Sequence, residues 1–240
     1  MESGHAKNVA NFEQVIIVLT ALGAVYNPSQ ALILLSALET KLTEAKAAFA
    51  AVDTAEGEKR LRVNDIQAEE AALDKFMVNI KRTVEVELND PAFTAEIQSI
   101  INRSRPKSRD TGLIDDPLTP GIDESRTAHS ASQSSRDNQI AGLADIIALL
   151  KLRADFKPND NEYKLAAIEA RFDALTLKNN AAKASNAVLG NALDARDAVL
   201  YDDETGIIKL VKLIKNQLAV KPGRTSAAYQ QINALEFRKY

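Results

Sequence analysis

The sequence predicts an all-α protein: a tandem duplicated helical bundle of two pseudo-equivalent four-helix units, each built on a long antiparallel hairpin. Alanine and leucine dominate the 240 residues, tryptophan is absent, and only nine glycines and seven prolines interrupt the chain. This composition is typical of long helices. Apolar residues recur three and four positions apart, the spacing of one helix face. Finally, two segments each place an aromatic residue, one polar residue and a proline before a helical pattern: "YNPSQALILLSALETKL" from Tyr26 and "FKPNDNEYKLAAIEARF" from Phe156.

The first half of the chain predicts four helices in the order short, long, long, short. The first is expected at about Asn11–Val25, because Pro28 disfavours helical geometry in the residue before it. A long helix then runs from near Ser29 to Gly57, a second long helix follows at about Glu58–Leu88, and a short one at about Pro91–Asn102. The residues expected to face inward are Leu35, Leu38, Leu42, Ala45, Phe49, Val52, Ile66, Leu73, Phe76, Met77, Ile80, Val84, Phe93, Ile97, Ile100 and Ile101.

The second half repeats this order. A helix at about Ser135–Ala154 ends at the "FKPND" break, where Asn159 and Glu162 have the spacing of a capping box. A long helix then reaches Gly190, another spans about Asn191–Leu218 with a break at Asp202–Gly206, and a short helix follows "KPGRTS". The residues expected to face inward are Ile140, Leu143, Ile147, Leu150, Leu165, Ile168, Phe172, Leu175, Asn179, Ala182, Asn186, Leu189, Tyr229, Ile232, Leu235 and Phe237.

Matched residues 130 positions apart favour an internal repeat over a coincidence between two amphipathic helices. We therefore expect an N-terminal helical repeat at 1–102, a linker or crossover loop at 103–134, and a C-terminal helical repeat at 135–240. The linker holds three of the seven prolines and no sustained periodicity. The matched residues are Tyr26, Pro28, Leu35, Leu38, Glu39 and Leu42, with Phe156, Pro158, Leu165, Ile168, Glu169 and Phe172 as their counterparts.

Several segments together resemble an uncharacterised family of bacterial proteins. They are "SASQSSRDNQIAGLADIIALL", the "FKPNDNEYKLAAIEARFDAL" that follows it, "ALDARDAVLYDDETG" and "IKLVKLIKNQLAV", with the "NFEQ" start, the "YNPS" break and "INRSRPKSR". That family consists of chains of about this length with a duplicated helical pattern. The resemblance covers most of the chain, and it implies an internally duplicated all-helical architecture and no catalytic activity.

Composition and motifs exclude several function classes. A net charge of −3 does not favour nucleic acid as a whole-protein partner, and the absence of cysteine excludes disulfides and thiolate metal sites. No phosphate-binding glycine loop, nucleophile elbow or HExxH occurs. No secretory signal is apparent, and the apolar Val15–Val25 segment is far shorter than the roughly twenty residues of a transmembrane helix. We expect a soluble, cytoplasmic protein that is not an enzyme and needs no cofactor.

The ionisable residues are expected to have structural roles. His5 and His129 are interpreted as surface imidazoles, because neither lies near other ligand residues. The acidic run from Asp194 to Glu204 matches no calcium loop, and we favour a solvated face with one intramolecular Arg–carboxylate pair over a cation site, with Arg196 and Asp197 as candidate residues. Arg62 lies at nearly the corresponding place in the first half, so a paired arginine is expected to set helix register in each half.

Two further sets of residues are candidates for register or binding. Asn179 and Asn186 are seven residues apart at apolar seam positions, where polar side chains specify register. A basic cluster follows the fourth helix and could contact phosphates. It has no interleaved aromatic residues, and acidic residues follow it in the same loop, so we favour a self-paired linker over a nucleic-acid site. The cluster consists of Arg103, Arg105, Lys107 and Arg109.

The sequence therefore predicts a non-enzymatic helical scaffold that binds another protein or associates with itself. The alternative is a membrane-active helical protein that shelters the apolar segment Val15–Val25 until it inserts. A third hypothesis is an unfamiliar helical enzyme or an ion-binding module that uses the Asp194–Glu204 run, although the spacing of that run matches no calcium loop.

Overall fold

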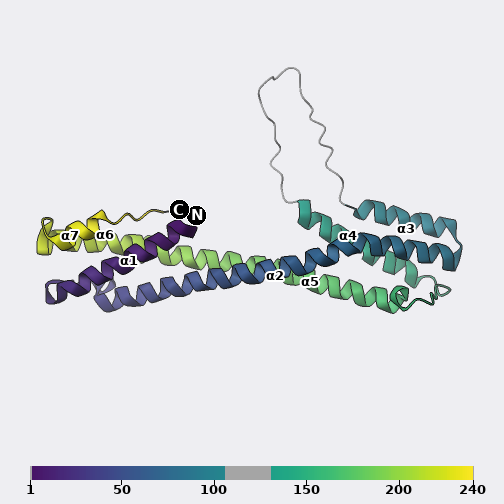
Figure 1. Ribbon diagram of the computed structural model, residues 1–240, viewed down its shortest axis with the longest axis horizontal. Helices are drawn as coiled ribbons and strands as arrows, with labels where there is room; N and C mark the ends of the chain where they lie inside the picture. Colours follow the sequence, from purple (N-terminus) through teal and green to yellow (C-terminus); the bar gives the residue numbers. More distant parts are fainter. Residues whose placement is uncertain (1, 106–130, 240) are drawn as a thin grey trace, which may run out of the picture. The chain divides into compact units, whose positions relative to one another are not determined.

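All regular structure in the computed structural model is helical over the described residues, which are 2–105 and 131–239 (Figure 1). The predicted all-α class is confirmed. The α-helices are α1 (Glu2–Leu22), α2 (Leu35–Leu88), α3 (Pro91–Ser104), α4 (Ala131–Lys151), α5 (Leu165–Tyr201), α6 (Ile207–Leu218) and α7 (Ala227–Ala234). Short 3₁₀ turns η1 (Gly23–Val25), η2 (Ala31–Ile33) and η3 (Asn161–Tyr163) precede the two longest helices, and a π-turn, η4 (Ala219–Gly223), follows α6.

The predicted turns at Gly57 and Gly190 are wrong. α2 continues through Gly57 as one helix of 54 residues, and α5 continues through Gly190 as one helix of 37 residues. A glycine inside a helix costs only about 1 kcal/mol relative to alanine, so it does not by itself end a helix. Since neither helix turns back on itself there, the predicted antiparallel hairpins are not formed by the described residues.

The helices instead form two compact units that each combine both halves of the sequence. Unit 1 comprises Met1–Arg60 and Ala184–Tyr240, and unit 2 comprises Leu61–Lys183. The boundaries of the units therefore fall inside α2 and α5, and they differ from the predicted division into 1–102 and 135–240. The reason is that α2 and α5 each continue through the glycine where a turn was expected, so each long helix contributes to both units.

The core of unit 1 is built around α1. Phe12, Val15 and Leu19 of α1 are fully buried, and they share one cluster with side chains of the first part of α2, the end of α5, α6 and α7. The α6 side chains in this cluster are Ile207, Leu210, Val211, Ile214 and Leu218. By length and composition alone, Gly4–Val25 is the one stretch of the described residues that could cross a membrane, a test that buried core helices also pass.

Unit 2 has a second core, formed by the end of α2 with α3, α4 and the first part of α5. All six inward residues predicted from Ile66 to Val84 are buried, as are the four predicted on α4. Asn89, in a left-handed conformation with φ 48°, separates α2 from α3. The Asp90 carboxylate then accepts a hydrogen bond from the Phe93 N–H at 3.0 Å, and Pro91 fills the first helical position. The predicted stop at "NDP" is confirmed.

Two other predicted breaks can be compared with the structure. α5 ends at Tyr201 and α6 starts at Ile207, which confirms the break at Asp202–Gly206. Asp202 Oδ1 accepts hydrogen bonds from the N–H groups of Glu204 and Thr205 at 3.0 and 2.7 Å. The capping box predicted at Asn159 is wrong by one residue. Asp160 accepts from the Glu162 N–H at 3.0 Å, and it caps the 3₁₀ turn η3, not α5.

Candidate functional site

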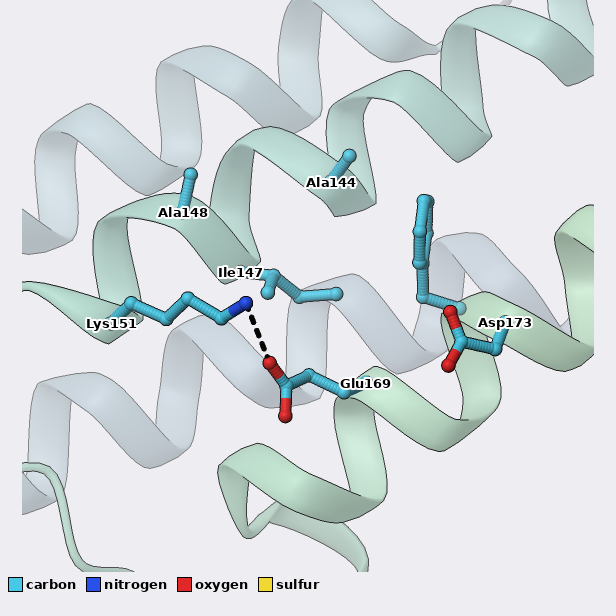
Figure 2. Close-up of a pocket in the computed structure, with 7 residues that line it drawn as sticks. Ala144, Ile147, Ala148, Lys151, Glu169 and Asp173 are labelled. Atoms are coloured by element: carbon cyan, nitrogen blue, oxygen red, sulfur yellow. Dashed lines mark ion pairs between the residues drawn. The ribbon is translucent and has the colours of Figure 1, made fainter.

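A groove of about 500 Å³ lies between α4 and α5 in unit 2 (Figure 2). Ile147 is buried at its floor beside the half-buried Phe172, while Ala144 and Ala148 leave space because their side chains are small. Lys151 and Glu169 pair across the two helices, with 2.7 Å between Nζ and Oε1. Asp173 adds a second carboxylate to the rim. We refer to this feature as the α4–α5 groove.

The helical period explains how the α4–α5 groove forms. Positions 144, 147, 148 and 151 recur three and four residues apart, so they share one face of α4. The Lys151–Glu169 pair is partly exposed, and such pairs contribute about 0–1 kcal/mol to stability. Within the described residues, no group of three or more His, Cys, Asp or Glu side chains could hold a metal ion. An apolar floor with a charged rim suits contact with another protein chain.

Ion pairs beside the groove tie α5 to α2 and α4. Lys178 Nζ donates to Glu69 Oε1 at 2.6 Å, and this hydrogen bond lowers the pKa of the Glu69 carboxyl below its usual 4.5. Asp137 on α4 accepts from Lys183 Nζ at 2.8 Å and from Asn179 Nδ2 at 2.7 Å. These contacts, with Lys183 contributing most, lower the pKa of Asp137 below its usual 3.8. Both carboxylates therefore stabilise the folded helices of unit 2.

Unit 2 is expected to lose stability in acid through these carboxylates. Their folded-state pKa values lie below the unfolded ones, so the stabilisation is complete above about pH 4.5 and is lost as the pH falls through the folded values. Thermal unfolding followed by circular dichroism from pH 7 to pH 2.5 measures this. Asp137→Asn should lower the free energy of unfolding by about 0.5–1 kcal/mol at pH 7. It should also make the loss of stability below about pH 4.5 smaller than in the wild-type chain. Asp173→Asn is the matched control, and an equal effect of both substitutions would contradict the assignment.

The structure brings some of the predicted register residues into contact and leaves others in solvent. Arg196 is buried and pairs with Asp197 at 2.7 Å, whereas Arg62 is exposed on α2 and forms no ion pair within the described residues. Asn179 is buried and bonded to Asp137, but Asn186 is exposed, so its predicted inward orientation is wrong. The buried face passes through Ser185 instead, because a straight helix of 3.6 residues per turn drifts away from a strict seven-residue repeat.

Only part of the basic cluster lies within the described residues. Arg103 and Arg105 are exposed at the end of α3, while Lys107, Arg109 and the predicted surface residue His129 lie outside these residues. Arg105 pairs with Asp74 through two hydrogen bonds, Nε to Oδ1 at 2.7 Å and NH2 to Oδ2 at 3.1 Å. These bonds raise the pKa of the Arg105 guanidinium above its usual value. One cation of the cluster is therefore neutralised by α2.

The interpretation of His5 as a surface imidazole is wrong. His5 is buried in unit 1, and its Nδ1 lies 2.6 Å from the hydroxyl oxygen of Tyr201. Asn8, one turn further along α1, donates to the same hydroxyl at 3.3 Å. The spacing of His5, Asn8 and Phe12 on one helix face was the sequence signal for this cluster. Its partner Tyr201 is 196 positions away from His5, so periodicity could not identify it.

Comparison with protein-family models, with curated proteins and with solved structures gives no match for this chain. The resemblance to a bacterial family of duplicated helical proteins therefore stays a prediction.

Proposed function

We propose that the chain is a duplicated helical scaffold without enzymatic activity, and that it functions by binding another protein chain. The duplication is supported by the element bounds. α2 begins at Leu35 and ends at Leu88, and residues 130 positions later are Leu165, the first of α5, and Leu218, the last of α6. The second copy of the long helix differs by the break at Asp202–Gly206.

Burial on α1 and α4 also supports the duplication. With an offset of 131, each buried position of α1 from His5 to Leu19, Val18 excepted, has a buried counterpart on α4. The pairs include polar residues, since the buried Asn8 corresponds to the buried Gln139. The α1 residues are His5, Asn8, Val9, Phe12, Val15, Ile16 and Leu19, and their counterparts are Arg136, Gln139, Ile140, Leu143, Ile146, Ile147 and Leu150.

The two copies differ in the turns that precede the long helices. Val25, Leu32 and Leu34 in unit 1 are 44%, 41% and 41% exposed, and we refer to these three residues as the apolar end. At an offset of 130, the second copy carries Asp155, Glu162 and Lys164 around the 3₁₀ turn η3. Since the same kind of turn forms with charged residues, the apolar side chains are not needed for folding. Clustered exposed apolar side chains mark interaction surfaces.

The apolar end is the observation that carries the proposed function, and a second copy of the chain is its proposed partner. An isologous contact places the same patch of both subunits face to face, which buries apolar area on each side. Burial of apolar surface stabilises such a contact by about 25 cal/mol per Å².

Size-exclusion chromatography with light scattering tests the proposal across a wide range of protein concentration. The wild-type chain should associate, and the triple variant Val25→Asp, Leu32→Glu, Leu34→Lys should remain monomeric while keeping its helical circular dichroism. Val86→Glu is the control, because Val86 is 79% exposed on α2 and lies outside the apolar end. A wild-type chain that stays monomeric throughout, or a triple variant that associates as well as the wild type, would refute the proposal.

A second candidate function is membrane activity through the sheltered segment Val15–Val25. It is supported by the length and hydropathy of Gly4–Val25 and by the complete burial of Val15 and Leu19 in the core of unit 1. Release of a dye trapped in lipid vesicles tests it. No release over a range of pH and lipid charge would eliminate this candidate.

A further inference from the structure

The C-terminal tail of unit 1 is an extended peptide that packs against the core. α7 ends at Ala234, and residues 235–239 contain no helix. Leu235 and Phe237 are partly buried against the core cluster of unit 1, while Glu236 and Arg238 are exposed. This alternation has the period of two that is typical of an extended chain. The tail therefore presents two apolar anchors to the unit and two charged side chains to solvent.

Side chains of α1 bind the backbone of this tail. Asn8 Nδ2 donates to the carbonyl oxygen of Arg238 at 2.7 Å, and Asn8 Oδ1 accepts from the N–H of Arg238 at 3.2 Å. Asn11 Nδ2 donates to the carbonyl oxygen of Glu236 at 2.7 Å. These bonds join the first part of α1 to the tail that follows α7 (Figure 1). A side-chain amide that donates to and accepts from one residue recognises main-chain groups, which every peptide carries.

The side chain of Asn8 is held in place by a buried hydrogen-bond network within unit 1. It is 1% exposed, and its Nδ2 also lies 3.3 Å from the hydroxyl of Tyr201, which bonds to His5 Nδ1 at 2.6 Å. A binding side chain fixed by surrounding hydrogen bonds does not have to be ordered when its ligand arrives. On α6, Lys215 Nζ lies 3.5 Å from the carbonyl oxygen of Leu235. The tail thus has polar contacts with α1 and α6.

We propose that Asn8 and Asn11, with the surface that receives Leu235 and Phe237, form a binding site for an extended peptide, and that this site takes the tail of a second copy of the chain. The occupant follows from the site itself, because the chain's own tail fits both its apolar and its hydrogen-bonding parts. Exchange of an identical terminal segment between two copies preserves every contact, so it needs no new surface.

This inference deepens the proposed binding of a second copy, but it uses a different surface. Its test uses two variants of the full chain. Both carry Val25→Asp, Leu32→Glu and Leu34→Lys, so that association through the apolar end cannot contribute. One chain also carries Leu235→Ala and Phe237→Ala, which weaken its tail and leave its site intact. The other carries Asn8→Ala and Asn11→Ala, which remove its site and leave its tail intact.

Sedimentation velocity should detect a complex in the mixture of the two chains and none in either chain alone. Gln14→Ala in place of the asparagine substitutions is the control, because Gln14 is exposed on the same helix; that chain keeps both its site and its tail, so it should associate with itself through exchanged tails. Absence of a complex in the first mixture would overturn the proposal. If the wild-type chain nevertheless associates through its apolar end, the proposed function still stands.

A peptide gives a test that does not depend on how the asparagine variants fold. A fluorescent peptide of residues 233–240 should bind the chain with the weakened tail, as measured by anisotropy. Methylation of the Arg238 nitrogen removes the N–H that donates to Asn8, and it should weaken binding about fivefold or more, since an unpaired buried acceptor costs about 1–3 kcal/mol. Equal affinity of the methylated and unmethylated peptides would overturn the proposed recognition of the backbone.

Discussion

Replacing Phe12 with alanine is expected to lower the free energy of unfolding of unit 1 by about 3–5 kcal/mol. Phe12 is completely buried on α1, in the cluster that α1 shares with α6 and α7. The substitution removes the transfer free energy of the ring and leaves a cavity that the surrounding helices fill only in part. Because typical domains are stable by about 5–15 kcal/mol, a loss of this size removes much of the stability of the unit.

Urea unfolding followed by circular dichroism measures this change, and hydrogen exchange assigns it to the helices of unit 1. Ile17→Ala is the matched control on the same helix. Ile17 is 56% exposed, so its truncation should change stability by no more than about 0.5 kcal/mol. Similar losses in the two variants would mean that α1 does not have its buried face where the structure places it.

The spacing of apolar residues predicted the all-helical class and many of the buried faces. It identified Phe76, Met77 and Ile80 on α2 and Leu143 on α4, all of which are buried. It also identified the helix stop at Asn89–Pro91, where proline and a capping aspartate leave few alternatives. These features are local: they depend on residues within one or two turns of helix, and a sequence pattern reports such neighbours directly.

The partner of each helix could not be predicted in the same way. An apolar seam shows that a face is buried, but it does not show which helix covers it. The seam of α2 fits a hairpin folded at Gly57 as well as it fits a continuous helix, and the difference between a helical and a turning glycine is small. As a result, the sequence predicted each half packing on itself, whereas the compact units combine helices of both halves.

The same limit applies to the candidate sites. A pair between Arg196 and a carboxylate of the acidic run was expected, and its partner is the neighbouring residue Asp197. The contacts of Asn8 with Tyr201 and Arg238 join residues that are 193 and 230 positions apart, and no motif connects them. The α4–α5 groove likewise depends on how α4 and α5 cross. Sites built from distant residues become visible only when the chain is folded.

Gly142→Ala is expected to destabilise unit 2 by about 1–3 kcal/mol, because α3 and α4 come too close for a side chain at this position. A Cβ at Gly142 would lie 2.6 Å from the Cβ and 2.8 Å from the Oγ of Ser104 on α3. The Ser104 Cβ is fixed by its backbone, so the clash cannot be relieved by rotation of a side chain. One of the two helices must move, which disturbs the buried Ile100 and Leu143.

Gly57→Ala is the matched control for this prediction. Gly57 also lies inside a helix, but a Cβ there meets no atom within 4 Å, so alanine should stabilise α2 by about 0.5–1 kcal/mol. Thermal and urea unfolding measure both variants. A turn at Gly57 would instead make alanine neutral or destabilising, so the sign of this one change separates a continuous α2 from the hairpin that the sequence suggested.

The double variant Gly142→Ala, Ser104→Gly isolates the contact itself. Removing the Ser104 side chain makes room for the new methyl group, so the two substitutions together should cost less than the sum of their separate effects, by about 0.5–3 kcal/mol. Additive losses would show that Gly142 is needed for a reason other than the approach of α3. A favourable coupling would identify Gly142 as the position that lets the last helix of the first half pack against the first helix of the second, the contact that makes unit 2 from both halves of the chain.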